Sequence, residues 1–191
     1  MALRHAVLAA LIDESASGYQ LTKIFDLSVA NYWYASPQQL YAELTRLEEG
    51  GLISGHAVVQ EKRPTKRVFT ITDSGREALR HFIDVASKPT FIRDDLLVKV
   101  HAAEVGDLSA LIEDLTERAS HAEAKANHFE GLLALLRGAQ TEDDFLADSP
   151  RIGPYLTGLR GISFERENAA WCRRTADVLA SRLQSTIAAG S

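Results

Sequence analysis

In the first 86 residues, the spacing of apolar residues is first typical of helices, then of strands, then of a helix again. This order restricts the possible folds more than any other feature of the chain. Apolar residues recur three and four positions apart, as on the buried side of a helix, in three segments: 3–11, 19–27 and 37–49. A Ser- and Gly-containing break at 15–18 separates the first two. The period then changes to two, which is typical of strands, at 56–61 and 68–72. A fourth helix is expected after its N-cap Thr72, with an inner face of Ala78, Leu79, Phe82, Ile83 and Ala86.

The third helical segment has complete start and stop signals. Ser36 is a favoured N-cap residue, Pro37 suits the first helical position, and Gln39 is placed to close a capping box. Gly50 and Gly51 end the segment, since glycine readily takes the left-handed conformation found after helices. Its leucines share one side, which leaves polar side chains on the others: Gln38, Gln39, Tyr41 and Thr45. Three helices followed by a hairpin form a winged helix-turn-helix, whose third helix enters the DNA major groove.

The expected hairpin tip, at 62–66, is strongly basic. Four cations lie within six positions: Lys62, Arg63, Lys66 and Arg67. Over residues 1–92 acidic and basic side chains are equal in number, so the formal net charge of −5 resides in 93–191. The overall charge gives no support to nucleic-acid binding. However, a local cluster matters more to a nearby phosphate than the total does, so we expect phosphate contact rather than only a solvated turn.

The second half of the chain is predicted to be helical. A short helix is expected at 94–104, a long one at 107–137, a polar loop at 138–153 and a last helix at 155–187. The long helices have narrow apolar stripes, which a second copy of the chain is best suited to cover. The sequence thus predicts a mainly α protein. A winged helix-turn-helix DNA-binding domain is expected at 1–88, and a helical dimerisation and candidate effector domain at 89–191.

Several short motifs, taken together, resemble the PadR family of bacterial transcriptional regulators. They are Gly18-Tyr19-Gln20-Leu21, Gln39-Leu40-Tyr41, Leu44-Thr45-Arg46-Leu47-Glu48, Gly51-Leu52-Ile53, and the Ile-Thr-x-x-Gly pattern within Phe69 to Gly75. The second half, through Arg93-Asp94 and 158–166, is similar to the longer helical C-terminal domain that some members carry. The resemblance implies a homodimer that binds a palindromic double-stranded operator, usually as a repressor released by a small molecule. Ser36-Pro37 departs from the usual family residues, which leaves the operator sequence open.

The resemblance also implies roles for single residues. Positions near phosphates match Tyr19 and Lys23, groove positions match Gln38, Gln39 and Tyr41, and the wing matches 63–67. The candidate DNA-binding residues are Tyr19, Lys23, Ser36, Gln38, Gln39, Tyr41, Lys62, Arg63, Thr65, Lys66 and Arg67. A glutamine can pair with an adenine edge, but capping and solvation are the simpler roles for both glutamines. For Arg46, an ion pair with Glu43, Glu48 or Glu49 and a structural contact elsewhere are equally good interpretations.

Aromatic residues suggest an effector pocket, because flat ligands stack on such rings. The candidates are Trp33, Tyr155, Phe164 and Trp171, together with Tyr32 and Tyr34 beside the first of them. Packing between the two domains is the alternative role, and for Trp33 and Trp171 the two roles are equally good and compatible. We expect the effector to be a small aromatic or otherwise flat ligand. Cys172, next to two arginines, is compatible with an oxidant-sensing thiol, although a buried structural thiol is favoured.

Other classes of function have little support. The sequence has no Walker loop, G-x-S-x-G motif or dinucleotide fingerprint, so neither an enzyme nor a cofactor is expected. The histidines and the lone cysteine do not have the spacing of metal ligands. One cysteine, no secretory signal and no apolar span predict a cytoplasmic protein. The alternative function is a helical protein-interaction module whose winged fold no longer binds DNA, against which the basic hairpin and the capped third helix argue.

Overall fold

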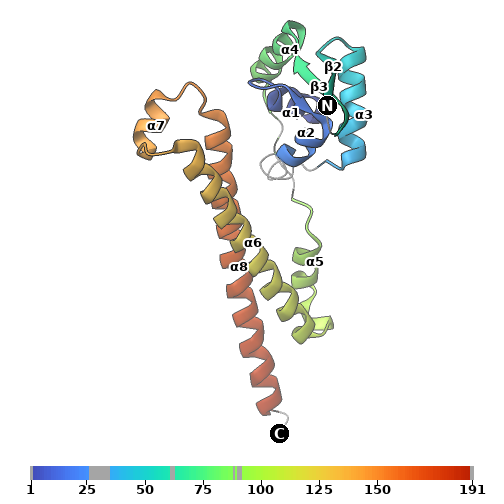
Figure 1. Cartoon of the computed structure of the whole chain (residues 1–191). Coiled ribbons are helices and arrows are strands. Elements are labelled where there is room, and N and C mark those ends of the chain that lie inside the picture. Colours follow the sequence, from blue (N-terminus) through green and yellow to red (C-terminus); the bar gives the residue numbers. More distant parts are fainter. Residues whose placement is uncertain (1, 26–34, 61–62, 88, 90–91, 190–191) are drawn as a thin grey trace. The chain divides into compact units, whose positions relative to one another are not determined.

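The computed structural model describes residues 2–25, 35–60, 63–87, 89 and 92–189 (Figure 1). The chain divides into two compact units, Met1–Pro89 (unit 1) and Thr90–Ser191 (unit 2). Unit 1 contains the sheet, and the elements of unit 2 are all helices within its described residues.

Unit 1 has the expected order of elements with one addition. Helices α1 (Ala2–Ala10), α2 (Gly18–Ile24) and α3 (Pro37–Glu49) precede strands β2 (Ile53–Gln60) and β3 (Arg63–Ile71), and α4 (Asp73–Asp84) follows. The addition is strand β1 (Ala16–Ser17), which pairs with β3 in an antiparallel sheet of order β1-β3-β2. The mainly α fold with a winged helix-turn-helix is confirmed. The interpretation of 15–18 as only a break was wrong. A two-residue strand forms only because it pairs with β3, and it is too short to show an alternating hydrophobic pattern in the sequence.

The β2–β3 hairpin, called the wing below, is longer than predicted. Strand β3 begins at Arg63, so Lys66 and Arg67 lie inside the strand, paired with β2, and not at a tip formed by 62–66. Pro64 favoured a turn, but the pairing is irregular in this stretch, and a bulge accommodates a proline. Lys62 lies outside the described residues.

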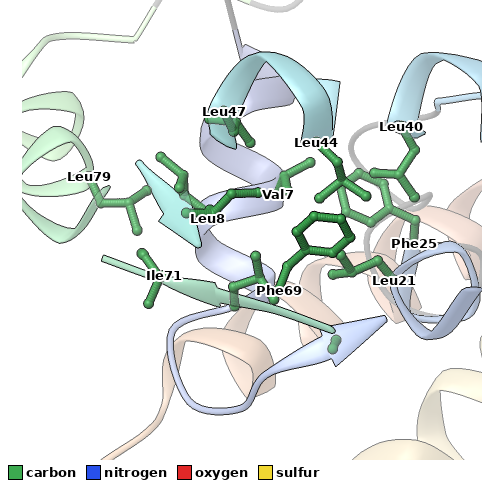
Figure 2. Close-up of a cluster of buried hydrophobic side chains, with 13 residues drawn as sticks. Val7, Leu8, Leu21, Phe25, Leu40, Leu44, Leu47, Phe69, Ile71 and Leu79 are labelled. Carbon is green, nitrogen blue, oxygen red and sulfur yellow. The ribbon is translucent and has the colours of Figure 1, made fainter. Parts of the chain in front are cut away.

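The core of unit 1 joins the apolar sides of its four helices to the sheet (Figure 2). Its buried side chains are Val7, Leu8, Leu11, Ala16, Leu21, Phe25, Leu40, Leu44, Leu47, Ile53, Phe69, Ile71 and Leu79. Each fully buried leucine contributes roughly 2 kcal/mol to folding. All three leucines of α3 point into this core, as predicted, so the rest of that helix is left for solvent or a ligand.

Helix α4 reaches the core through Leu79. The buried face predicted for α4 extended too far toward the C-terminus of the helix. Phe82 and Ile83 are 44% and 78% exposed, and Ala86 lies beyond the end of the helix. The last turn of α4 extends past the core, and there the Phe82 ring stacks on the ring of His5 with centroids 4.0 Å apart.

The first turn of α4 packs closely against the turn that follows α3. Thr72 caps α4 as predicted: its hydroxyl accepts from the Gly75 N–H at 3.1 Å and donates to the Gly51 carbonyl at 2.7 Å. A Cβ on Gly75 would lie 2.2 Å from the carbonyl oxygen of Leu52. Gly51 itself has a φ of 66°, which other residues rarely adopt. The α3–β2 turn and the start of α4 therefore depend on these two glycines.

Unit 2 is built around two long helices. Its elements are α5 (Asp95–His101), the 3-10 helix η2 (Ala103–Val105), α6 (Leu108–Arg137), α7 (Glu142–Asp148) and α8 (Gly153–Ala189). No helix in the described part of the chain is long and apolar enough to cross a bilayer.

Helix α7 lies where a polar loop was expected. Thr141 caps it, accepting from the Asp144 N–H at 3.2 Å, and Phe145 is buried with its ring 4.8 Å from that of Tyr155. The run of acidic residues that suggested a loop is in fact favourable in the first turn of a helix, where the macrodipole is positive. The loop prediction was therefore wrong.

Helices α6 and α8 run side by side in opposite directions (Figure 1). Ion pairs connect them: Glu123 with Arg173, Lys125 with Glu165, and Glu130 with Arg166. Along the middle of the two helices many of the buried residues are small, which favours a close approach: Ala119, Ala122, Ala126, Ala169, Cys172 and Ala176.

Cys172 is fully buried in this contact. Burial raises the pKa of its thiol, with only a partial opposing effect from Arg118. A low-pKa, accessible thiolate is what an oxidant sensor needs, so the structure agrees with the favoured interpretation of a structural cysteine.

Candidate nucleic-acid interface

The N-terminus of α3 is organised by a capping box, as predicted. The Ser36 hydroxyl accepts from the Gln39 N–H at 3.3 Å, and the Gln39 Oε1 accepts from the Ser36 N–H at 2.9 Å. The side-chain oxygen of Gln39 is therefore engaged in holding the helix start. Gln38, one residue earlier, is exposed, and its side chain makes no hydrogen bond within the described residues. Gln38 is the glutamine better placed to contact a ligand.

Tyr41 lies against the start of α2. A Cβ on Gly18 would be 2.3 Å from Cε1 of the Tyr41 ring, so the glycine is what allows the ring to pack there. Tyr41 nevertheless remains half exposed. Thr45 donates its hydroxyl to the Tyr41 carbonyl at 3.2 Å, which occupies that hydroxyl within the helix. Arg46 pairs with Glu43 at 3.3 Å, one of the ion pairs considered for it.

Helix α2 presents Tyr19 and Lys23 on its surface. Tyr19 is 64% exposed, and the Lys23 Nζ lies 4.9 Å from the centroid of its ring, a cation–π contact. A second capping box starts this helix, with Ser17 as N-cap and Gln20 as its partner. The Ser-x-x-Gln spacing was a readable signal for a helix start at Gly18, and the sequence analysis missed it.

The candidate DNA-binding residues of the wing differ in their surroundings. Thr65 is exposed and Lys66 is half buried on β3, whereas Arg67 Nη2 donates to Glu48 Oε1 at 2.6 Å. This hydrogen bond, with help from the Gly55 N–H, lowers the pKa of Glu48 against a smaller effect of burial. For Arg63 the structure describes only the backbone, in β3.

The predicted effector aromatics lie at separate levels of α8. Tyr155 is buried; its hydroxyl donates to Glu142 at 2.7 Å and accepts from Arg137 at 3.2 Å. The bond to Glu142, then burial, raise the pKa of Tyr155. Phe164 is about 14 Å further along the helix and Trp171 about 10 Å beyond it, so the structure does not bring the three rings together. Trp33 and its neighbours Tyr32 and Tyr34 lie outside the described residues.

A cavity of about 330 Å³ lies near α5, and the described residues form no candidate metal site. The cavity is lined by Lys99, Ala102, Ala103, Gly106, Asp107, Ala110, Leu111 and Asp114, and none of the predicted aromatics is among them. Over the same part of the chain no three His, Cys, Asp or Glu side chains gather as metal ligands would.

Two family models match the chain. Residues 7–81 match the transcriptional regulator PadR-like family, and residues 92–180 match the family described as virulence activator alpha C-term. A probable transcriptional regulator of Mycobacterium tuberculosis is 30% identical over 189 residues, which cover 94% of this chain and 98% of the relative.

Bacillus subtilis supplies a second relative, the negative transcriptional regulator PadR. It is 25% identical to this chain over 170 residues, which cover 88% of this chain and 92% of the relative. Its crystal structure with operator DNA has a TM-score of 0.74 at 23% identity, covering 94% of this chain and 99% of that one. Its complex with p-coumaric acid has a TM-score of 0.67 at 23% identity, covering 93% and 95%.

Proposed function

The chain belongs to the PadR-like family of transcriptional regulators, and we propose that it is a dimeric repressor that binds operator DNA through unit 1. Its relatives are named as regulators and not as enzymes. The observation that carries the proposal is the likeness to Bacillus subtilis PadR bound to operator DNA, over 94% of this chain. The name of that relative, a negative regulator, supports repression.

In the proposed complex α3 enters the major groove and the wing follows the phosphate backbone. Gln38 reads a base edge, because the oxygen of Gln39 is engaged in the capping box. Tyr19 and Lys23 of α2 hold a phosphate, and Lys66 and Arg63 contribute wing cations. Each of these assignments is an expectation from the family resemblance that fits the exposure of the side chains that the structure describes.

The proposed dimer interface is a second apolar stripe on α8. Phe164, Trp171 and Val178 recur every seven residues on α8. Trp171 is partly buried and packs against the core cluster that includes α6 residues. Phe164 and Val178 are 42% and 52% exposed. A seven-residue repeat is the pattern by which one long helix packs along another, and a second copy supplies such a helix. A two-fold dimer in turn requires an operator with two related half-sites.

We expect the wing and α3 to respond differently to substitution. Lys66→Ala should weaken binding to operator and random DNA equally and lower the slope of log K against log salt by about one. Gln38→Ala should cost about 1–3 kcal/mol on the operator alone. Fluorescence anisotropy, with a duplex selected by the protein from a random library and a scrambled duplex, measures both effects.

Gln39→Ala is the control for the capping box. It should lower the melting temperature through loss of the cap, which is worth about 1 kcal/mol. If the wing substitution alters sequence preference and the Gln38 substitution does not, the proposed docking orientation is wrong. If the wild type selects no duplex, the protein-interaction module becomes the better function.

An aromatic ligand is proposed to release the repressor, since Bacillus subtilis PadR forms a complex with p-coumaric acid. We expect an aromatic carboxylic acid to lower operator affinity, and the operator to lower ligand affinity by the same factor. The chain has two tryptophans, so Trp33→Phe leaves Trp171 as the only one and Trp171→Phe leaves Trp33. Quenching in either variant by p-coumaric acid or a panel of aromatic acids locates the site. A panel that changes neither fluorescence nor operator affinity would rule out this kind of release.

A further inference from the structure

One carboxylate oxygen connects the end of α3 to both strands of the wing. Glu48 lies in the last turn of α3, and its Oε1 accepts from the Gly55 N–H at 2.9 Å and from Arg67 Nη2 at 2.6 Å. Gly55 belongs to β2 and Arg67 to β3. The three residues, called the clamp below, therefore join the helix expected to read bases to the hairpin expected to follow phosphates.

The sequence makes room for this contact at Gly55. A Cβ there would lie 2.6 Å from Glu48 Oε1, 2.6 Å from Arg67 Nε and 3.0 Å from the Phe69 ring. Glycine inside a strand is unfavourable for folding and often marks a close approach of another group. Here that group is the Glu48 carboxylate, which reaches the backbone because no side chain blocks it.

The charges explain why Arg67 is drawn to this position. A carboxylate in the last turn of a helix faces the negative end of the macrodipole, which is unfavourable, and Glu49 follows Glu48 directly. Arg67 offsets both effects, and its guanidinium also lies 6.0 Å from the centroid of the Phe69 ring. Lys66, its neighbour, has no ion-pair partner within the described residues.

We propose that Glu48 is a positioning residue of the DNA interface, and that Arg67 serves the clamp rather than a phosphate. The inference rests on the proposed function. A duplex must meet α3 and the wing at the same time, so a wing held at a fixed angle to α3 loses less conformational freedom on binding. Residues outside the contact surface then affect affinity through the geometry that they hold.

The test is a double-mutant cycle in the full-length protein, with the selected duplex as probe. Glu48→Ala and Arg67→Ala should each weaken operator binding about 3- to 10-fold, and the double variant no more than the stronger single one, because all three break the same clamp. The salt slope should stay at the wild-type value in Arg67→Ala, whereas Lys66→Ala lowers it by about one. Hydrogen exchange of the Gly55 amide should become faster in Glu48→Ala.

Glu49→Ala is the matched control, since it removes the same charge from the adjacent, exposed position. It should leave operator affinity within about twofold of wild type or raise it slightly. Melting curves of all variants identify any loss of folding, and Arg67→Ala tests the clamp from the other side if Glu48→Ala folds poorly.

Three results would overturn the inference. If Glu48→Ala binds as tightly as wild type or tighter, and Arg67→Ala lowers the salt slope by about one, Arg67 contacts a phosphate. Additive effects in the double variant would show that the two residues act separately. A wild-type protein that binds no duplex would overturn the proposed function and this inference together, whereas normal wild-type binding with an unaffected Glu48→Ala variant overturns only the inference.

Discussion

Replacing Gly75 with alanine should destabilise unit 1 by about 3 kcal/mol. The added Cβ would lie 2.2 Å from the Leu52 carbonyl oxygen and 2.8 Å from the Ile71 side chain. The obstacle is backbone that the α3–β2 turn holds in place, so α4 must move away from the core. Urea unfolding followed by circular dichroism measures the loss.

Gly131→Ala is the matched control for that substitution. Gly131 lies within α6, and a Cβ there would meet nothing within 4 Å. The change should therefore stabilise unit 2 by about 0.5–1 kcal/mol, the usual gain of alanine over glycine in a helix. A loss below about 1 kcal/mol for Gly75→Ala would show that the α4 start adapts, contrary to this account.

A fragment that ends at Ser87 should be a monomer and should bind operator DNA about 100-fold more weakly than the full chain, or worse. It keeps the core of unit 1, but it lacks every residue of the proposed interface on α8. Linking two binding domains makes the second contact intramolecular, and that advantage of about 100- to 10,000-fold disappears in a monomer. Light scattering and anisotropy measure mass and affinity.

Val178→Glu in the full chain tests the same interface without truncation. The substitution places a charge on the exposed apolar stripe of α8, where burial in a dimer would require its desolvation. The variant should dissociate at concentrations at which the wild type is dimeric. A full-strength dimer from the 1–87 fragment would place the interface in unit 1 and contradict the proposal.

Features of the fold with local signals could be predicted from the sequence. Ser36 with Gln39 and Thr72 with Gly75 specify helix starts by hydrogen bonds that reach only three residues. Strand β1 could not be predicted, because it depends on pairing with Val68 and Phe69 of β3. Helix α7 had a local start signal in Thr141 and the acidic residues that follow it, but its packing of Phe145 against Tyr155 could not be predicted.

The candidate site shows the same division. The exposure of Gln38 and Tyr41 follows from the periodic leucines of α3, which the sequence displays. The contact between Glu48 and Arg67 joins residues 19 positions apart, and both were assigned other roles or several possible ones from sequence. Burial patterns indicate which side of a helix faces out, but they do not indicate which exposed charges meet.

Because Cys172 is buried, we expect the native chain to react very slowly with thiol reagents. Maleimides react with the thiolate, and here the thiol is inaccessible and its pKa is raised. A cysteine introduced at the exposed Val59 of the wing can therefore carry a spin label or dye without first removing the native one. In a dimer such a label appears twice, and the distance between the two copies reports directly how far apart the two wings stand with and without ligand.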